Sequence, residues 1–267
     1  MIPTAETIAE FQENGFVIVP DLLNAEEVDL LSRIARSDRD LAASTYGRQD
    51  ADGVAVMLSV RNELGDDMYS AIAASQRVVE RMTAFLGDEV YHYHHKLILK
   101  EPRVGGAWEW HQDYGYWYNN GCLYPDMGSC LIAIDAASQA NGCLQVLRGS
   151  HRLGRINHQK TGDQTGADLE RVAAAVERLE LVHVELPAGG AVFFHANLLH
   201  RSDQNHSENP RWALICCFNT RHNDPYKESR HPGYSPLEIV PDEVVLERGR
   251  TLWHAVSETS GTDASDS

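Results

Sequence analysis

The sequence predicts an α+β protein that is mainly β, in which N-terminal helices precede a double-sheet barrel of the jelly-roll type. Apolar residues repeat at helical spacing through much of the first 86 residues. Short β-type runs separated by turn signals dominate from residue 89 onward. A chain of 267 residues with 43% hydrophobic residues can bury one sizeable core. We therefore expect a single domain over residues 1–256.

Four helices are expected, and the first two carry recognisable end signals. Thr4 is positioned to cap the first helix, and Gly15 is positioned to end it in the left-handed conformation. Asn24, with Glu27 three residues later, resembles a capping box at the start of the second helix. The apolar spacing behind such signals predicts helices at residues 4–14, 25–37, 67–86 and 167–179.

The remaining regular structure is expected to be β. Turn signals such as Asn141-Gly142 separate runs that are rich in β-branched and aromatic residues. The last eleven residues, 257–267, are small, polar and acidic, so we expect a disordered tail there. The predicted strands cover residues 16–19, 89–99, 130–135, 144–147, 181–186, 191–195 and 211–219.

The composition disfavours several classes of partner. A formal net charge of −16 repels phosphate backbones and anionic membranes, so nucleic acid is not an expected partner. No run approaches the length of a membrane span. The five cysteines form no CxxC pair and are expected to be reduced and mostly buried in a cytoplasmic protein. The expected partner is a small-molecule substrate, and the pattern does not specify the oligomeric state.

The strongest functional signal is a His-x-Asp triplet, His111 and Asp113, inside the densest aromatic cluster of the chain. In extended backbone, residues i and i+2 project to one face, so both side chains can bind one ion. Two imidazoles and one carboxylate are the ligand set of non-heme iron oxygenases. The triplet is weak evidence by itself, because 13 histidines and 39 acidic residues give about two such triplets by chance. Three others, at 183/185, 206/208 and 222/224, are interpreted as chance.

The segment that follows residue 191 supplies a third candidate ligand. An expected apolar strand delivers His200 at its far end, and a polar turn then leads to a returning strand that begins at Arg211. His200 is therefore the expected third ligand. Arg211 shares one strand face with Ala213 and Ile215, and its guanidinium can bind a carboxylate through two parallel hydrogen bonds.

These segments resemble the phytanoyl-CoA dioxygenase family. The likeness extends from Phe11, in Phe-x-x-x-Gly-Phe-Val-Ile-Val, to about Tyr226. The resemblance implies a double-stranded β-helix, a jelly-roll or cupin-like barrel. It also implies iron(II), 2-oxoglutarate and O2 as cofactor and cosubstrates, with hydroxylation of a small organic substrate and release of succinate and CO2. The motifs that carry it are Trp110-His-Gln-Asp113, Asn141-Gly-Cys-Leu144, Gly149-Ser-His151, and His200-x-Ser202 with Arg211 eleven residues after His200.

The resemblance also implies roles for individual residues. Arg211 and Ser202 would hold the distal carboxylate of 2-oxoglutarate. Lys96 lies in a stretch that lines the same pocket, although it could instead be a solvated strand lysine. The presence of a carboxylate ligand favours hydroxylation, because the related halogenases lack it. The three implied catalytic metal ligands are His111, Asp113 and His200.

The expected substrate is a small zwitterion, such as an aminoalkylphosphonate or a betaine-like compound. Aromatic faces near the triplet can hold a cationic ammonium group. Residues 221–231 place basic and polar groups where the chain leaves the barrel, which suits an acidic head group. The aromatic candidates for substrate binding are Trp110, Tyr114, Tyr116 and Trp117.

Several alternatives stay open. The protein could be a lipid or acyl-CoA hydroxylase of the same family, or a metal-binding sensor barrel without turnover. A zinc hydrolase on the same ligands is a further alternative, but it would give Arg211 no task. A second metal site at His92, His94 and His95 lacks a nearby acidic residue, so we interpret these as core and pocket histidines.

Overall fold

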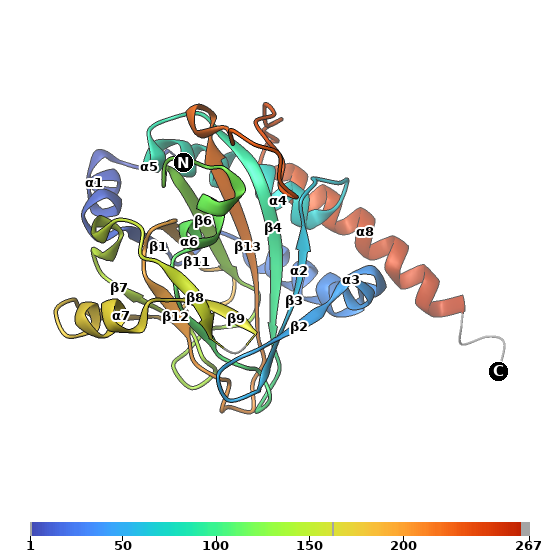
Figure 1. The fold of residues 1–267 in the computed structure, drawn as a ribbon. Helices are drawn as coiled ribbons and strands as arrows, with labels where there is room; N and C mark the ends of the chain where they lie inside the picture. The colour runs from blue at the N-terminus through green and yellow to red at the C-terminus, as the bar shows by residue number, and fades with distance from the viewer. Residues whose placement is uncertain (1, 162, 263–267) are drawn as a thin grey trace.

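Two antiparallel sheets face each other and enclose the barrel core, with helices on the outside (Figure 1). The computed structural model describes residues 2–161 and 163–262. The arrangement is a double-stranded β-helix with N-terminal helices on its flank, which confirms the predicted fold class. Within the described residues, no helix is both long and apolar enough to cross a membrane.

The larger sheet forms one wall of the barrel. Its longest pairing joins β4 to β13, where Arg211 lies opposite Lys100 and Ile215 opposite Lys96. Every neighbouring pair in this sheet is antiparallel. In spatial order the strands are β1 (Phe16–Val19), β11 (Ala191–His195), β6 (Met127–Ala133), β13 (Arg211–Thr220), β4 (Val90–Lys100), β3 (Ala55–Arg61) and β2 (Tyr46–Gln49).

The smaller sheet forms the opposite wall. It contains, in spatial order, β10 (Leu181–Val184), β7 (Leu144–Leu147), β12 (His200–Ser202) and β5 (Trp108–His111). A separate two-stranded hairpin, β8 (His158–Thr161) with β9 (Gln164–Ala167), packs against β5. Apolar side chains of both walls meet between the sheets, among them Leu131 and Val146. The space that remains between the walls is lined by residues of both sheets, including β4, β5, β12 and β13.

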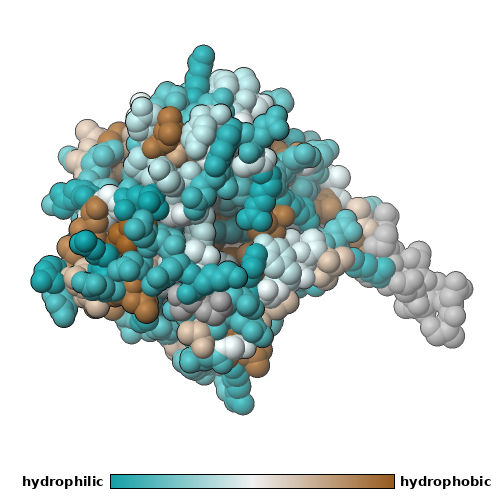
Figure 2. Space-filling view, viewed as in Figure 1, coloured by the Kyte–Doolittle hydropathy of each residue, from teal (hydrophilic) through white to brown (hydrophobic). Residues whose placement is uncertain are grey.

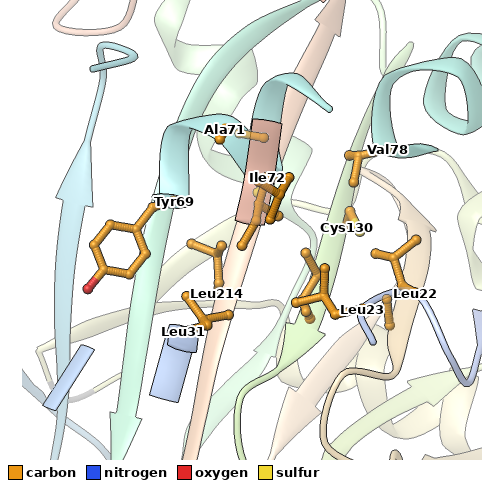
Figure 3. Packing of buried hydrophobic residues seen from close by; sticks show 14 of the residues in the cluster. Leu22, Leu23, Leu31, Tyr69, Ala71, Ile72, Val78, Cys130 and Leu214 are labelled. Atoms are coloured by element: carbon orange, nitrogen blue, oxygen red, sulfur yellow. The ribbon is translucent and has the colours of Figure 1, made fainter. Parts of the chain in front are cut away.

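Helices cover the outer face of the larger sheet. Figure 3 shows side chains such as Leu31 and Ile72 gathered over Leu214 of β13 and Cys130 of β6. The last helix, α8, packs against α2 and α4 and extends away from the body on the right of Figure 1. The helices are α1 (Ala5–Asn14), α2 (Ala25–Ser37), α3 (Arg39–Ser44), α4 (Met68–Ala74), α5 (Gln76–Leu86), α6 (Asp113–Trp117), α7 (Leu169–Val176) and α8 (Glu243–Thr262).

The predicted helix end signals are confirmed. The side chain of Thr4 caps α1, and Gly15 ends this helix with a φ of 80°. Asn24 and Glu27 form the capping box of α2, since each side chain accepts a hydrogen bond from the other's backbone N–H. These signals are local, so neighbouring residues alone determine them.

The helix predicted over 67–86 is wrong in one respect, because the structure divides it into α4 and α5. Ser75 between them has extended backbone and forms a parallel bridge with Val240, and the N–H of Gln76 donates to the Val240 carbonyl. Pairing with a segment 165 residues further along the chain thus interrupts the helix. The predicted helix over 167–179 is shorter, at Leu169–Val176.

Several elements were not predicted. They include β2, β3, the β8–β9 hairpin and α8. Helix α8 continues to Thr262, so it includes residues 257–262 of the segment for which the sequence predicts disorder. Residues 263–267 of that segment lie outside the described residues. All five cysteines are buried and unpaired with one another.

Candidate active site

Three buried side chains meet at one end of the barrel. His111 ends β5, Asp113 begins α6, and His200 begins β12, the strand next to β5. His111 and His200 are direct partners in the β5–β12 pairing, and their ring centroids lie 4.0 Å apart. One ligand atom from each of the three residues lies within 4.8 Å of the other two, so the group could hold a metal ion. We call this group the His-Asp-His triad.

Two details of this geometry differ from the predictions. The backbone leaves the extended conformation at Asp113, because α6 begins there and the N–H of Tyr114 donates to the Ala196 carbonyl. His200 does not end the apolar strand of residues 191–195. The chain turns between that strand and β12, so His200 crosses from the larger sheet to the smaller one. The turn brings His200 beside His111.

Backbone carbonyls fix both imidazole rings. Nδ1 of His111 donates to the Glu109 carbonyl over 2.7 Å, and Nδ1 of His200 donates to the Leu198 carbonyl over 2.9 Å. With Nδ1 occupied in this way, Nε2 of each ring is left to act as the ligand atom. Burial lowers the pKa of both histidines, so the rings are neutral near pH 7, the form that binds metals.

The carboxylate of Asp113 is held by one of its oxygens. Oδ2 accepts a hydrogen bond of 2.9 Å from the Ser129 hydroxyl. Oδ1 lies 3.9 Å from Nε2 of His111 and 4.0 Å from Nζ of Lys96. Burial is the largest single influence and by itself lowers the pKa of Lys96, but attraction to Asp113, Cys217 and Tyr46 together outweighs it and the net pKa is raised, so this lysine is a cation. Oδ1 is thus the oxygen that faces the other triad members.

A small space, here called the inner cavity, lies on one side of the triad. The Arg211 side chain reaches it from the start of β13, and the Ser202 side chain reaches it from β12. Arg211 is only 4% exposed, and within the described residues its Nε has no hydrogen-bond partner and its guanidinium forms no salt bridge. Burial lowers the pKa of Arg211 to about 10, and Cys143 and Asp135 offset only part of that effect. A buried cation without a counter-ion is costly, and a carboxylate in this cavity would compensate it.

A second space, the outer cavity, lies on the other side of the triad and measures about 360 Å³. Lys96 and Trp108 line both cavities, as do His111 and Asp113. The face seen in Figure 2 is mostly hydrophilic and is hollowed near its middle. The His-Asp-His triad thus lies where the two cavities meet, and the buried guanidinium of Arg211 lines one of them.

Residues 11–213 match the family model described as phytanoyl-CoA dioxygenase (PhyH), which is about three quarters of the chain and includes the whole triad and Arg211. The chain belongs to the phytanoyl-CoA dioxygenase family. This confirms the resemblance that the sequence motifs indicate.

Relatives of this chain are named for reactions on small molecules. The chain is 25% identical over 259 residues to L-proline trans-4-hydroxylase of Streptomyces griseoviridis, covering 90% of this chain and 94% of that protein. It is 24% identical over 265 residues to ectoine dioxygenase of Stutzerimonas stutzeri, covering 90% and 88%.

Solved structures share the fold. EctD from S. alaskensis superposes with a TM-score of 0.74 with Fe bound, at 23% identity, and 0.72 with 2-oxoglutarate and 5-hydroxyectoine, at 22% identity. Each covers 90% of this chain and 88% of that one. This likeness shows a shared fold, the double-stranded β-helix.

The four aromatic residues predicted to bind substrate divide into two pairs in this family member. Tyr116 and Trp117, from α6, line the outer cavity. Trp110 lies under the guanidinium of Arg201 at 5.3 Å and packs against a separate apolar cluster. The hydroxyl of Tyr114 donates to the Leu123 carbonyl over 2.6 Å. Within the described residues, Trp110 and Tyr114 line neither cavity.

Other residues of the outer cavity come from β4 and from the loop after β13. His94 lies on β4 two residues before Lys96, and alternation along the strand places both side chains inside the barrel. His94 is thus a pocket histidine, in agreement with the interpretation of the His92, His94 and His95 group as core and pocket residues. Arg230 and His231 also line the cavity, at the end of the loop for which basic groups were predicted. The His-Asp-His triad is the sole metal-binding group among the described residues, so the alternative site at His92, His94 and His95 is not supported.

Proposed function

We propose that the protein is an iron(II)- and 2-oxoglutarate-dependent hydroxylase of a small organic substrate. The observation that carries this proposal is the position of the His-Asp-His triad between two cavities. One cavity offers a buried, uncompensated guanidinium for a dicarboxylate, and the other offers space for a substrate. The reaction converts substrate, 2-oxoglutarate and O2 into hydroxylated substrate, succinate and CO2.

The triad suits iron(II). Two neutral imidazoles and one carboxylate bind on one face of an octahedron and leave three positions open. His111, Asp113 and His200 would hold the ion, through Nε2 of each histidine and Oδ1 of the aspartate. Bound iron, with 2-oxoglutarate and O2, supplies the oxidising power for C–H hydroxylation. Hydrogen bonds from Nδ1 of each histidine and to Oδ2 of Asp113 fix the ligand orientation before metal enters.

The inner cavity suits 2-oxoglutarate. Arg211 would bind the distal carboxylate through two charge-assisted hydrogen bonds, with the hydroxyl of Ser202 as a further donor. Lys96 reaches both cavities, so its ammonium can attract an anionic group on either side of the triad. Burial of these groups excludes water and strengthens their interaction with the ligand.

The outer cavity suits a small zwitterion. The aromatic rings of Tyr116 and Trp117 can hold an ammonium group, and Arg230 can bind an acidic head group. A volume of about 360 Å³ fits a compound of amino-acid size better than an acyl-CoA thioester. L-Proline, named as the substrate of one relative, is a small zwitterion of this kind.

A succinate assay tests this function. Protein purified without oxygen and loaded with iron(II) would be supplied with 2-oxoglutarate, O2 and a panel of amino acids, betaines, aminoalkylphosphonates and acyl-CoA esters. We expect at least one zwitterion to release succinate in a 1:1 ratio with hydroxylated product. Stoichiometric turnover with acyl-CoA esters alone would overturn the substrate class but keep the oxygenase. The absence of succinate throughout, with iron bound, would favour the sensor barrel.

A further inference from the structure

The inward face of β4 carries a second lysine, Lys100, to which the proposed function assigns no role. Lys96 and Ile98 line the inner cavity, so alternation places the side chain of Lys100 on the same face, beyond them. The strand register places Lys100 directly opposite Arg211. Two basic residues therefore stand side by side, with Arg211 in the lining of the inner cavity and Lys100 next to it outside that lining.

Lys100 is unusually enclosed for a lysine, with an exposure of 0%. A loop closes over it, since a Cβ added at Gly105 would approach the Cα of Lys100 to 2.9 Å. Its Nζ donates to the backbone carbonyl of Asp203. Asp203 directly follows Ser202, so this bond fixes the peptide beside the hydroxyl assigned to 2-oxoglutarate.

Within the described residues, no carboxylate pairs directly with Lys100, whose Nζ donates to a backbone carbonyl instead. The titratable groups that face it are the cation Arg211, the carboxylates of Asp203 and Asp50, and the thiol of Cys143. Within the described part of the chain, neither Lys100 nor Arg211 forms a salt bridge.

Other donors already bind both of these carboxylates. Asp203 accepts from the Gln145 amide and lies 3.3 Å from the Arg201 guanidinium. Asp50 accepts from the backbone N–H groups of residues 52, 54 and 107 and from the Gln204 amide. Burial, followed by repulsion from Arg211, lowers the pKa of Lys100 well below its usual range. A negative group bound beside Arg211 would offset the repulsion from its guanidinium, raise the pKa of Lys100 and favour the protonated amine.

We propose that Lys100 is a positioning residue for 2-oxoglutarate, which holds the Ser202–Asp203 segment and takes up a proton when the distal carboxylate reaches Arg211. This inference rests on the proposed function. The linkage has a definite sign. Protonation of Lys100 accompanies binding, so the affinity for 2-oxoglutarate falls as pH rises through the pKa of Lys100 in the ligand-free protein, and levels off above its pKa in the complex.

Calorimetry tests the proton count directly. 2-Oxoglutarate would be titrated without oxygen into iron(II)-loaded protein, at one pH in two buffers that differ in ionisation enthalpy, and the series repeated from about pH 6.5 to about pH 9. We expect the wild type to take up a fraction of one proton per ligand. Lys100→Met, which keeps the volume but not the charge, should bind 2-oxoglutarate about tenfold more weakly near pH 7, take up no proton, and retain iron. Lys160→Met, at an exposed position of β8, is the matched control and should behave as wild type.

The outcomes separate this inference from the function it rests on. No proton uptake by the wild type, or unchanged uptake by Lys100→Met, would overturn the role of Lys100. If Lys100→Met does not fold, the wild-type proton count decides, together with Lys100→Arg, whose permanent charge should abolish uptake. Undiminished 2-oxoglutarate binding by Arg211→Ala would instead refute the proposed inner-cavity site itself.

Discussion

Single hydrogen bonds determine how the triad presents its ligand atoms. The carbonyls of Glu109 and Leu198 each accept from the histidine two residues later, and Ser129 donates to one oxygen of Asp113. Each partner is backbone or a fully buried side chain, so the ligand atoms are arranged before metal arrives. Metal binding then requires little reordering of these side chains.

Removing one imidazole should release the metal. We expect His200→Ala to lower the affinity for iron(II) on the order of 100-fold or more, because two ligands hold a labile first-row ion poorly. Iron content after anaerobic loading and desalting measures this. His206→Ala is the control, since His206 belongs to a chance His-x-acid triplet and is exposed. Full iron content in His200→Ala would place the third ligand elsewhere.

Removing the guanidinium of Arg211 should separate cosubstrate binding from metal binding. Arg211→Ala should retain iron and lose about 2 to 4 kcal/mol of binding free energy for 2-oxoglutarate, the range for a buried charge-assisted contact. Arg211→Lys, which keeps the charge but not the two-pronged geometry, should recover part of the loss. Anaerobic binding titrations with iron(II)-loaded protein measure both. An unchanged dissociation constant for Arg211→Ala would refute the assignment.

At the scale of elements, four hydrogen bonds hold the β8–β9 hairpin over the outer cavity. His158 accepts from the Gln112 backbone N–H over 2.9 Å, and the Tyr116 hydroxyl donates to the Thr165 carbonyl. The Gln164 side chain accepts from the backbone N–H of Glu109 in β5 and donates to the carbonyl of Ala107, just before β5. The hairpin thus depends on side chains rather than on a continuous sheet ladder.

Gly115 is the point where this hairpin meets α6. A Cβ at this position would lie 2.1 Å from Cε1 of His158, which is far inside contact distance. Gly115→Ala should therefore displace the hairpin and destabilise the fold by about 1 to 3 kcal/mol. Urea unfolding and tryptic cleavage near Lys160 measure the two effects. Gly233→Ala, where the nearest atom is a single carboxylate oxygen at 3.1 Å, is the control. Equal protease resistance in both variants would contradict this account.

The same scale explains what the sequence could and could not predict. Caps such as Thr4 and Asn24 depend on residues within three positions, so their helices were predicted to within a residue. Ser75 interrupts a helix through a contact with Val240, and no local pattern contains that information. The triad was predicted because its ligand types and spacing are restricted. The direction in which the Trp110 side chain points was not predicted, since it depends on Arg201 of a different strand.

At the scale of the whole molecule, neutral histidines outside the triad are part of the folded core. Burial lowers the pKa of His92 to about 3, of His95 to about 4 and of His195 to about 3. The unfolded chain binds protons at these groups near pH 6.5, where the folded protein does not. Their contribution to stability is therefore complete above about pH 6.5 and is lost as pH falls toward the folded-state pKa values.

Acid should accordingly destabilise the fold before most carboxylates titrate. We expect the unfolding free energy to fall below about pH 6.5 by up to about 1.4 kcal/mol per pH unit for each of the three histidines. Urea unfolding of iron-free protein at a series of pH values measures the slope. His195→Gln should lower this slope by up to about 1.4 kcal/mol per pH unit, the contribution of one bound proton. A stability independent of pH between about 6.5 and 5 would contradict the prediction.

Alternate residues of β4 point into the barrel and lie along the line from the outer cavity to the inner cavity. His94 lines the outer cavity, Lys96 lines both cavities, Ile98 lines the inner cavity, and Lys100 lies opposite Arg211. Alternate residues of a strand are about 6.6 to 6.8 Å apart, so backbone geometry sets the spacing between substrate and cosubstrate. A change at His94 can then alter which substrate fits without moving the residues around Arg211. Substrate choice and cosubstrate binding are thus separable traits on one strand, and one barrel of this kind can acquire new substrates while keeping its chemistry.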